Sequence, residues 1–178
     1  MQIIHYELII LINKENKVLF LHRRNKNIFK APGHWGLVGG KIEQGEKPIE
    51  CAIREAHEEV GIILKQEDLT FVNVAWEKVT ATPPNQTAIT ETLIACTFVA
   101  RTWQGIPINK EPEQHDAMEW FALDVPPDPI WPIHGQILKA WQNLEFNIYD
   151  INFFLFSSSF TLATTMFANT NAVLCDSL

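Results

Sequence analysis

Apolar runs separated by polar breaks follow one another along the first 150 residues, and their lengths predict strands mixed with helices. Runs rich in Ile, Leu and Val at residues 6–12 and 18–22 predict two strands, and the polar segment 13–17 between them is typical of a hairpin connection. The glycine-punctuated segment 35–40 predicts a strand that bends sharply at its end. Further strands are predicted at residues 69–79, 89–103 and 118–123.

The pattern changes from strand to helix between residues 48 and 60. Apolar side chains recur there at the three-and-four spacing of one helix face, at Ile49, Ala52, Ile53, Ala56 and Val60. Pro48 suits the first turn of a helix, and Gly61 can adopt the left-handed conformation that ends one. A second helix is predicted at about 132–144, after a proline-rich break.

This order of elements predicts one α+β domain, an α/β/α sandwich with a mixed β-sheet, over residues 1–150. Residues 151–174 carry no charge and are rich in Phe, Ser, Thr and Asn. Their apolar stretch is too short and too diluted for a membrane span, which needs roughly 20 apolar residues. We therefore treat 151–178 as a separate tail: added strands, a segment covered by a partner, or a disordered end.

The net charge of −7 narrows the choice of partner. Proteins that bind nucleic-acid polymers draw much of their affinity from Lys and Arg on phosphates, so an acidic chain is not expected to bind them. A small polyphosphate remains compatible, because a divalent cation can supply positive charge locally. A homodimer is left open.

Cysteine usage indicates a reducing compartment. The three cysteines, Cys51, Cys96 and Cys175, form neither a disulfide framework nor a CxxC metal motif. The first 17 residues show no basic leader and no small-residue cleavage site. We expect a cytoplasmic protein.

Three carboxylates in the predicted helix carry the candidate chemistry. At about 100° per residue, Glu55, Glu58 and Glu59 are expected to share one face, apart from the apolar set. Like charges so close together repel, and two of them lie near the helix C-terminus, where the helix dipole disfavours anions. Oxygen ligands at this density suit Mg²⁺, with Mn²⁺ as the second choice.

The same segment resembles the Nudix box of the MutT-like pyrophosphohydrolases. The matching residues are Gly40, Glu46, Arg54, Glu55, Glu58, Glu59, Gly61 and Ile62, and Ala56 is a mild departure at an aliphatic position. The wider resemblance, with Trp-Gly-Leu-Val-Gly-Gly at 35–40 and the predicted strand at 120–124, reaches about residue 144. It implies a Nudix-type sandwich in which the box forms a loop, a helix and a loop.

The resemblance also implies roles for the box residues. Glu55, Glu58 and Glu59 would ligate the metal ions, and Gly40 would let its own carbonyl approach one of them. Arg54 would hold Glu46, and through it the loop, against the helix. Gly61 would only end the helix.

The implied reaction is hydrolysis of a nucleoside triphosphate, or another nucleoside diphosphate derivative, by water that a metal activates. A glutamate would accept the proton of that water. Glu58 and Glu59 are the favoured bases, and the loop acids Glu111 and Glu113 are the second candidates. Of these two loop acids, we include Glu113 among the predicted catalytic residues. An ADP-ribose or nucleotide-sugar pyrophosphatase and a non-catalytic Nudix module that senses a nucleotide are the alternatives.

Substrate contacts are expected from Arg23 and Trp131. A guanidinium at the end of the second predicted strand could bind phosphate in a bidentate manner, and an indole could stack on a base. Trp131-Pro132 is followed by Ile133 and His134, where relatives that act on oxidised purine nucleotides have acidic residues, so this sequence departs from that specificity. His57 is expected at the surface, and His22, His34 and His115 show no zinc spacing.

Overall fold

The computed structural model describes residues 2–24, 33–81, 87 and 89–146. Its elements, in chain order, are β1 (Gln2–Leu11), β2 (Lys17–Arg23), β3 (Trp35–Gly36), α1 (Pro48–Val60), the single 3₁₀ turn η1 (Gln66–Asp68), β4 (Leu69–Ala81), β5 (Ile89–Ala100), β6 (His115–Ala122) and α2 (Pro132–Phe146). The tail predicted at 151–178 and its boundary at 150 lie outside the described residues.

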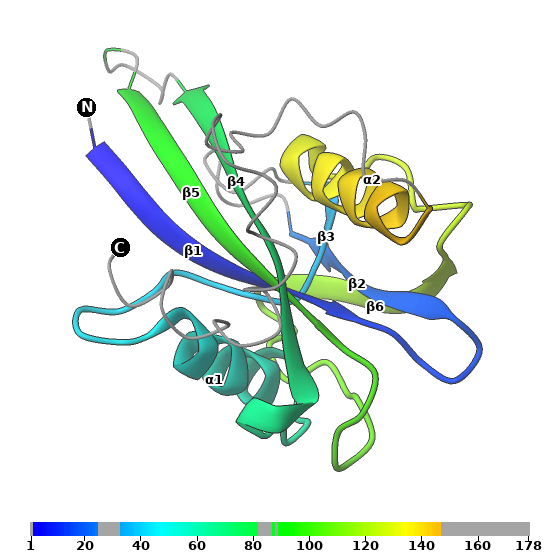
Figure 1. The fold of residues 1–178 in the computed structure, drawn as a ribbon. Helices are drawn as coiled ribbons and strands as arrows, with labels where there is room; N and C mark the ends of the chain where they lie inside the picture. The colour runs from blue at the N-terminus through cyan, green and yellow to red at the C-terminus, as the bar shows by residue number, and fades with distance from the viewer. Residues whose placement is uncertain (1, 25–32, 82–86, 88, 147–178) are drawn as a thin grey trace, which may run out of the picture.

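The strands form two three-stranded sheets. One has the order β1-β5-β4, in which β1 runs parallel to β5 and β4 runs antiparallel to it. The other has the order β3-β2-β6 and is antiparallel throughout. Figure 1 shows α1 and α2 on opposite sides of the strands. This arrangement confirms the predicted α+β sandwich with a mixed sheet.

The predicted hairpin between the first two strands is wrong, although its turn forms. The side-chain oxygen of Asn13 accepts hydrogen bonds at 2.9 Å from the backbone N–H groups of Glu15 and Lys17, which closes the turn. The strands then diverge into different sheets, joined only by a bridge between Ile12 and Val18. β1 pairs with β5 instead, as suits a strand that is apolar on both faces.

The segment predicted as a strand at 35–40 pairs as a strand only at Trp35–Gly36. Val38 and Lys41 then form bridges with Ile9 and Tyr6 of β1, so the segment crosses from one sheet to the other. Gly39 has φ +144, and a Cβ there would lie 2.2 Å from the backbone oxygen of Glu7. Only glycine fits this crossing without displacing β1.

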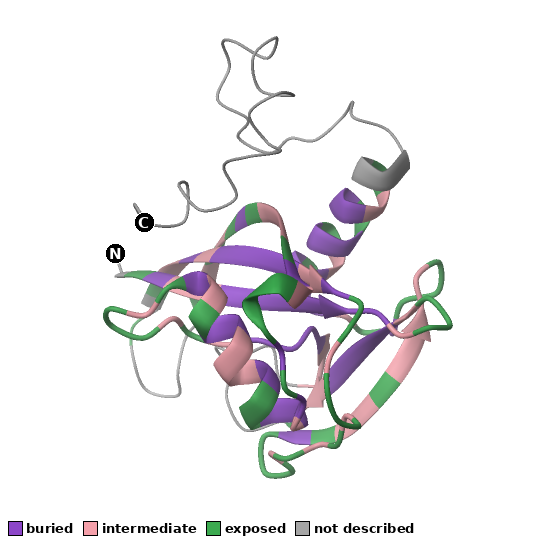
Figure 2. Cartoon of the chain, turned by 60° about the horizontal axis from the view of Figure 1, so that its bottom comes forward, coloured by how far each residue is buried: buried purple, intermediate pink, exposed green. Residues whose placement is uncertain are grey.

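Side chains alternate between two apolar cores along β1. Leu8 and Ile10 pack in the core that contains residues of α2, whereas Ile9 and Leu11 pack in the core that contains residues of α1. Figure 2 shows the central strands as largely buried, with exposed residues on the outer side of α1. An odd-numbered position of β1, such as Glu7, therefore faces α1.

The boundaries of two other strands differ from the prediction. β6 begins at His115, three positions before the predicted start at 118, and β5 ends at Ala100 rather than 103. The earlier start of β6 places His115 in the sheet beside β2. Within the described residues, neither helix is long and apolar enough to cross a bilayer.

Candidate metal and catalytic site

Neighbouring residues determine where helix α1 begins and ends. Pro48 occupies its first turn, and the N–H of Lys47 donates to the Glu50 side chain at 3.1 Å. Gly61 ends the helix with φ +69, and its N–H donates to the His57 carbonyl at 3.1 Å. His57 itself is exposed. These ends fix which turns of α1 carry the acidic residues.

The three box glutamates of α1 are buried to different degrees. The exposed fraction of the side chain is 7% for Glu59, 13% for Glu55 and 50% for Glu58. The expectation that all three lie apart from the apolar set is wrong for Glu59, because seven residues make nearly two full turns and align it with buried Ala52. The three carboxylates therefore range from a buried position at Glu59 to a half-exposed position at Glu58.

Arg54 joins the box loop to the helix. Its Nε and Nη2 donate to the two oxygens of Glu46 at 2.8 and 3.1 Å, and its Nη2 also donates to the Lys41 carbonyl at 3.2 Å. Its Nη1 donates to Glu55 at 2.7 Å and to Glu58 at 2.8 Å. These hydrogen bonds lower the pKa of Glu46 and raise that of Arg54.

Glu59 is held from two sides. Its Oε2 accepts a hydrogen bond from the backbone N–H of Gly39 at 2.9 Å, and its Oε1 lies 3.6 Å from Nε2 of His115. Burial raises the pKa of Glu59 to about 8, although the charge of Arg23 and the Gly39 bond oppose this shift. Glu59 is therefore fixed in position by Gly39 and lies beside His115, in a place where burial disfavours its charged form.

Gly40 brings the loop into contact with Glu55. A Cβ at Gly40 would lie 2.0 Å from Oε1 of Glu55, so any other residue would displace that carboxylate. The Gly40 carbonyl accepts a hydrogen bond from the N–H of Glu7 at 2.9 Å. Sγ of Cys51 also donates to that oxygen, at 4.0 Å, and the predicted approach of the carbonyl to a metal stays a prediction.

A fourth carboxylate, missed from the sequence, lies beside these residues. Glu7 of β1 is fully buried, and neither of its side-chain oxygens has a hydrogen-bond partner among the described residues. Burial raises the pKa of Glu7 well above its ordinary value, and the charges of Glu55 and Glu59 raise it further. The only signal in the sequence was one acid within an apolar run.

The loop before β6 and the first residue of β6 add one residue each, Glu111 and His115. Ligand atoms of Glu59, Glu111 and His115 lie within 4.8 Å of one another. The loop is tied to α1, because the N–H of Lys110 donates to the Glu59 carbonyl at 2.9 Å. Glu113, the loop acid carried into the predicted catalytic set, is exposed and does not belong to this group.

Arg23 lies between the carboxylates and Trp131. Its guanidinium carbon is 4.9 Å from the centroid of the Trp131 ring. Burial lowers the pKa of Arg23, while the charges of Glu59, Tyr6 and Glu55 oppose that shift. Its Nε has no hydrogen-bond partner among the described residues. Arg23 therefore has one buried donor without a partner among the described residues, beside the acidic cluster.

Trp131 is almost fully buried, at 7% exposure, and stacks on His134 with ring centroids 4.7 Å apart. The predicted role of Trp131 in stacking on a base would require one side of its ring to open. Trp76, by contrast, is 55% exposed on β4. Arg24 is exposed at the end of β2.

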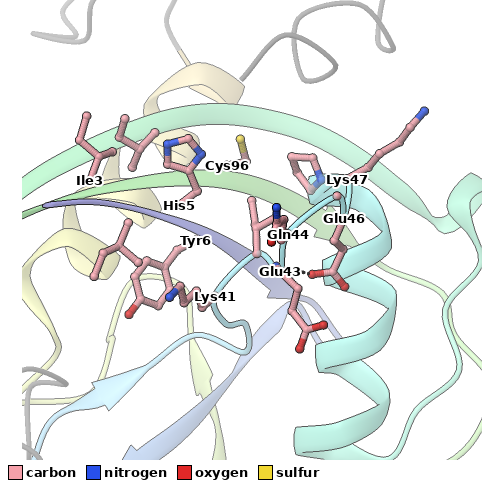
Figure 3. Close-up of a pocket in the computed structure, with 14 residues that line it drawn as sticks. Ile3, His5, Tyr6, Lys41, Glu43, Gln44, Glu46, Lys47 and Cys96 are labelled. Carbon is pink, nitrogen blue, oxygen red and sulfur yellow. Dashed lines mark hydrogen bonds between the residues drawn. The ribbon is translucent and has the colours of Figure 1, made fainter.

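A hollow lies next to this cluster rather than in it. It has a volume of about 740 Å³ and lies between β1, β5 and the box loop (Figure 3). His5 and Cys96 line it from the strands, and Lys41 and Lys47 line it from the loop. Glu43 and Glu46 line it, but Glu55, Glu58 and Glu59 do not, so it is not the acidic site.

The residues at the acidic site fit a divalent cation. Carboxylate and carbonyl oxygens are the ligands that Mg²⁺ and Mn²⁺ prefer. Carboxylates outnumber cations among the charges that act on buried Glu7 and Glu59, which leaves a deficit of positive charge among the described residues there. A cation would offset that deficit.

Comparison with solved structures shows the same fold. A MutT NUDIX hydrolase from Burkholderia pseudomallei is 28% identical, with a TM-score of 0.63, over 79% of this chain and 98% of that one. The MutT protein from Methanosarcina mazei Go1 is 18% identical, with a TM-score of 0.60, over 82% and 97% of the two chains. The second likeness supports the fold alone.

Two curated relatives match shorter segments. An RNA pyrophosphohydrolase from Francisella tularensis subsp. mediasiatica is 37% identical over 64 residues, which are 36% of each chain. An ADP-ribose pyrophosphatase from Methanocaldococcus jannaschii is 44% identical over 62 residues, which are 35% of each chain. The matched part thus spans about a third of the length of either relative.

The model of the NUDIX domain matches residues 7–141, which is most of this chain and includes both helices except the end of α2. The matched range contains the whole box and the loop with Glu111. The chain therefore belongs to the NUDIX domain family.

Proposed function

We propose that this protein is a divalent-metal-dependent pyrophosphohydrolase, with Mg²⁺ as the physiological ion and Mn²⁺ as a substitute. Its substrate would be a nucleoside triphosphate or another nucleoside diphosphate derivative, cleaved at a phosphoanhydride bond. The observation that carries the proposal is the set of hydrogen bonds between the box loop and α1. Arg54 donates to Glu46 of the loop and to Glu55 and Glu58 of the helix, and Glu59 accepts from Gly39.

Glu55, Glu58, Glu59 and the Gly40 carbonyl would hold the cation. A divalent ion bound there would offset the charge of the phosphates and make an attacking water more acidic. Arg54 keeps Glu55 and Glu58 oriented before substrate arrives, since it donates to both. This orientation reduces the rearrangement needed during the reaction.

Glu58 is the best placed of the four candidate bases. Its side chain is half exposed, whereas that of Glu59 is buried and already accepts from Gly39. A base must reach the water and pass its proton to solvent afterwards. Glu58 meets both conditions, with one oxygen oriented by Arg54.

Arg23 supports an anionic substrate. The buried Nε of its guanidinium has no partner among the described residues, and its charge lies close enough to Glu59 to act on the pKa of that carboxyl. A phosphate next to the metal would satisfy that donor with a charge-assisted hydrogen bond. Trp131 holds the other side of the guanidinium, so Arg23 is positioned before substrate binds.

Two alternatives remain, and one panel separates them. The local likeness to an ADP-ribose pyrophosphatase favours ADP-ribose and nucleotide sugars as second-choice substrates. A non-catalytic Nudix module would bind a nucleotide without turnover. Retention of every box carboxylate supports an enzyme rather than such a module.

The decisive experiment is a hydrolysis panel of nucleoside triphosphates, ADP-ribose, nucleotide sugars and a 5′-triphosphorylated RNA, with Mg²⁺ or Mn²⁺. Glu58→Gln should lower kcat by about 100-fold or more, the usual contribution of a general base. Glu43→Gln, the same change at an exposed position of the box loop, is the control and should retain activity. No turnover of any substrate by the unaltered protein would refute the enzymatic proposal.

A further inference from the structure

Glu7 lies directly against the loop of the Nudix box. Its backbone N–H donates to the Gly40 carbonyl at 2.9 Å, and its backbone oxygen lies where a Cβ on Gly39 would be. As an odd-numbered residue of β1, it points to the same side as Ile9 and Leu11, the side covered by α1. Its carboxylate is therefore directed towards the helix that carries the box glutamates.

No group of the described chain neutralises this carboxylate. Both oxygens of Glu7 are buried without a hydrogen-bond partner among the described residues, and the side chain is fully inaccessible to solvent. The two charges that act on it most strongly are those of Glu55 and Glu59, which repel it. The charge of Arg54 opposes them with a weaker effect, and Arg54 already donates to Glu46, Glu55 and Glu58.

Such an arrangement is costly for a fold unless something else binds there. Buried carboxylates in proteins are normally paired, hydrogen-bonded or bound to a metal. Here the first two solutions are absent among the described residues. A cation held jointly with the acids opposite would supply the third, since carboxylate oxygens are preferred ligands of Mg²⁺ and Mn²⁺.

We propose that Glu7, which lies outside the Nudix box, is an additional carboxylate of the divalent-metal site and shares a cation with Glu55 and Glu59. Its role rests on the proposed function, because the shared cation is the one that the box would bind. Glu7 is thus a metal-holding residue supplied by the sheet, opposite the residues supplied by α1.

The test is Mn²⁺ binding to the full chain, measured from the electron paramagnetic resonance signal of free Mn²⁺, together with the melting temperature with and without Mn²⁺. Glu7→Gln keeps the shape of the side chain and removes its charge. Thr97→Val is the matched control, because Thr97 is also a fully buried residue of the same sheet whose Oγ1 has no partner among the described residues. Thr97 faces the opposite side, the core that contains Ala95 and residues of α2.

Glu7→Gln should weaken the tightest Mn²⁺ binding by about tenfold or more, as the loss of a supporting group at a metal site commonly does. The metal-free melting temperature should not fall, because a buried repulsive charge has been removed, whereas the rise caused by Mn²⁺ should shrink. Thr97→Val should leave Mn²⁺ affinity unchanged. A Glu7→Gln protein that binds Mn²⁺ like the unaltered chain would overturn the proposal.

Two further variants keep the outcome decisive. If Glu7→Gln does not fold, Glu7→Asp retains the charge but withdraws it by one methylene, and unchanged Mn²⁺ affinity in that variant would equally overturn the role of Glu7. Glu55→Gln separates the two proposals. Weakened binding in Glu55→Gln but not in Glu7→Gln refutes the role of Glu7 alone, whereas no Mn²⁺ binding by the unaltered chain refutes the metal site itself.

Discussion

The Nε2 atom of His115 lies 3.6 Å from Oε1 of Glu59, a contact between the first residue of β6 and the next-to-last residue of α1. Both side chains are buried, and Glu111 has a ligand atom within 4.8 Å of them. The contact links the loop before β6 to the acidic cluster. An imidazole at this place can orient Glu59 or share its cation.

His115→Gln is therefore expected to weaken Mn²⁺ binding and to lower kcat/KM by about 10- to 100-fold, the usual cost of removing a group that supports a metal ligand. Mn²⁺ titration and steady-state kinetics would measure both effects. His57→Gln, at an exposed position of α1, is the control. Normal metal affinity and rate in His115→Gln would show that the histidine only fills the core.

Arg54→Lys should impair both the site and the stability of the box loop. Lysine keeps the charge, but it cannot donate in the planar, bidentate geometry with which Arg54 holds Glu46. Charge-assisted hydrogen bonds contribute about 1.5–3 kcal/mol, so a loss of about 2 kcal/mol in unfolding free energy is expected. Urea denaturation would measure it, and Lys65→Arg, at an exposed position outside the box, is the reference change.

Gly40→Ala should reduce activity far more than Gly45→Ala. The added Cβ at Gly40 would lie 2.0 Å from Oε1 of Glu55, whereas nothing lies within 4 Å of one at Gly45. Gly45 has φ +84, so alanine there costs about 1–2 kcal/mol in backbone strain but leaves the carboxylates in place. Similar kcat values and similar Mn²⁺ affinities in the two folded variants would contradict this assignment.

Stability should fall with pH below about 6.5 because of His134. Burial, followed by the charge of Arg23, holds the pKa of His134 well below its ordinary value, and its Nδ1 accepts from the Leu37 N–H at 2.8 Å. The unfolded chain binds a proton there near pH 6.5, whereas the folded chain does not. Stability from this group is therefore complete above that pH and is lost as pH falls towards the folded pKa.

His134→Asn provides the measurement of this effect. Its Oδ1 can accept from Leu37 in place of Nδ1, but it does not titrate. Between pH 7 and pH 5, the unaltered protein should lose up to about 2 kcal/mol more unfolding free energy than His134→Asn. His57→Asn, at an exposed position, is the control, and equal pH dependence in the unaltered protein and His134→Asn would disprove the assignment.

Local signals allowed the helix and the box to be predicted. Pro48 and Gly61 lie at the ends of α1 in both the sequence pattern and the structure, because the conformations that start and stop a helix depend on neighbouring residues. Glu55 and Glu58 could be predicted from the family resemblance because the Nudix box is a motif of neighbouring residues. Their roles in catalysis remain proposals.

Long-range pairing explains what the sequence analysis missed. Glu7 interrupts an apolar run, and its importance depends on β1 pairing with β5 and facing α1, which no local pattern specifies. Similarly, Glu111 and His115 join Glu59 only because the loop before β6 returns to the end of α1. Glu113 was predicted as a candidate base only from its position in the loop sequence. The turn at 13–17 forms as predicted, but a turn alone does not determine which strands pair.

The bridges from Val38 and Lys41 to Ile9 and Tyr6 give the box loop a second task. β1 is the last strand of its sheet, and an uncovered outer strand offers free N–H and C=O groups to other chains. By occupying those groups, the loop protects the protein from edge-to-edge aggregation. Changes to this loop are therefore constrained by solubility as well as by chemistry, and a variant that detaches it should self-associate through β1.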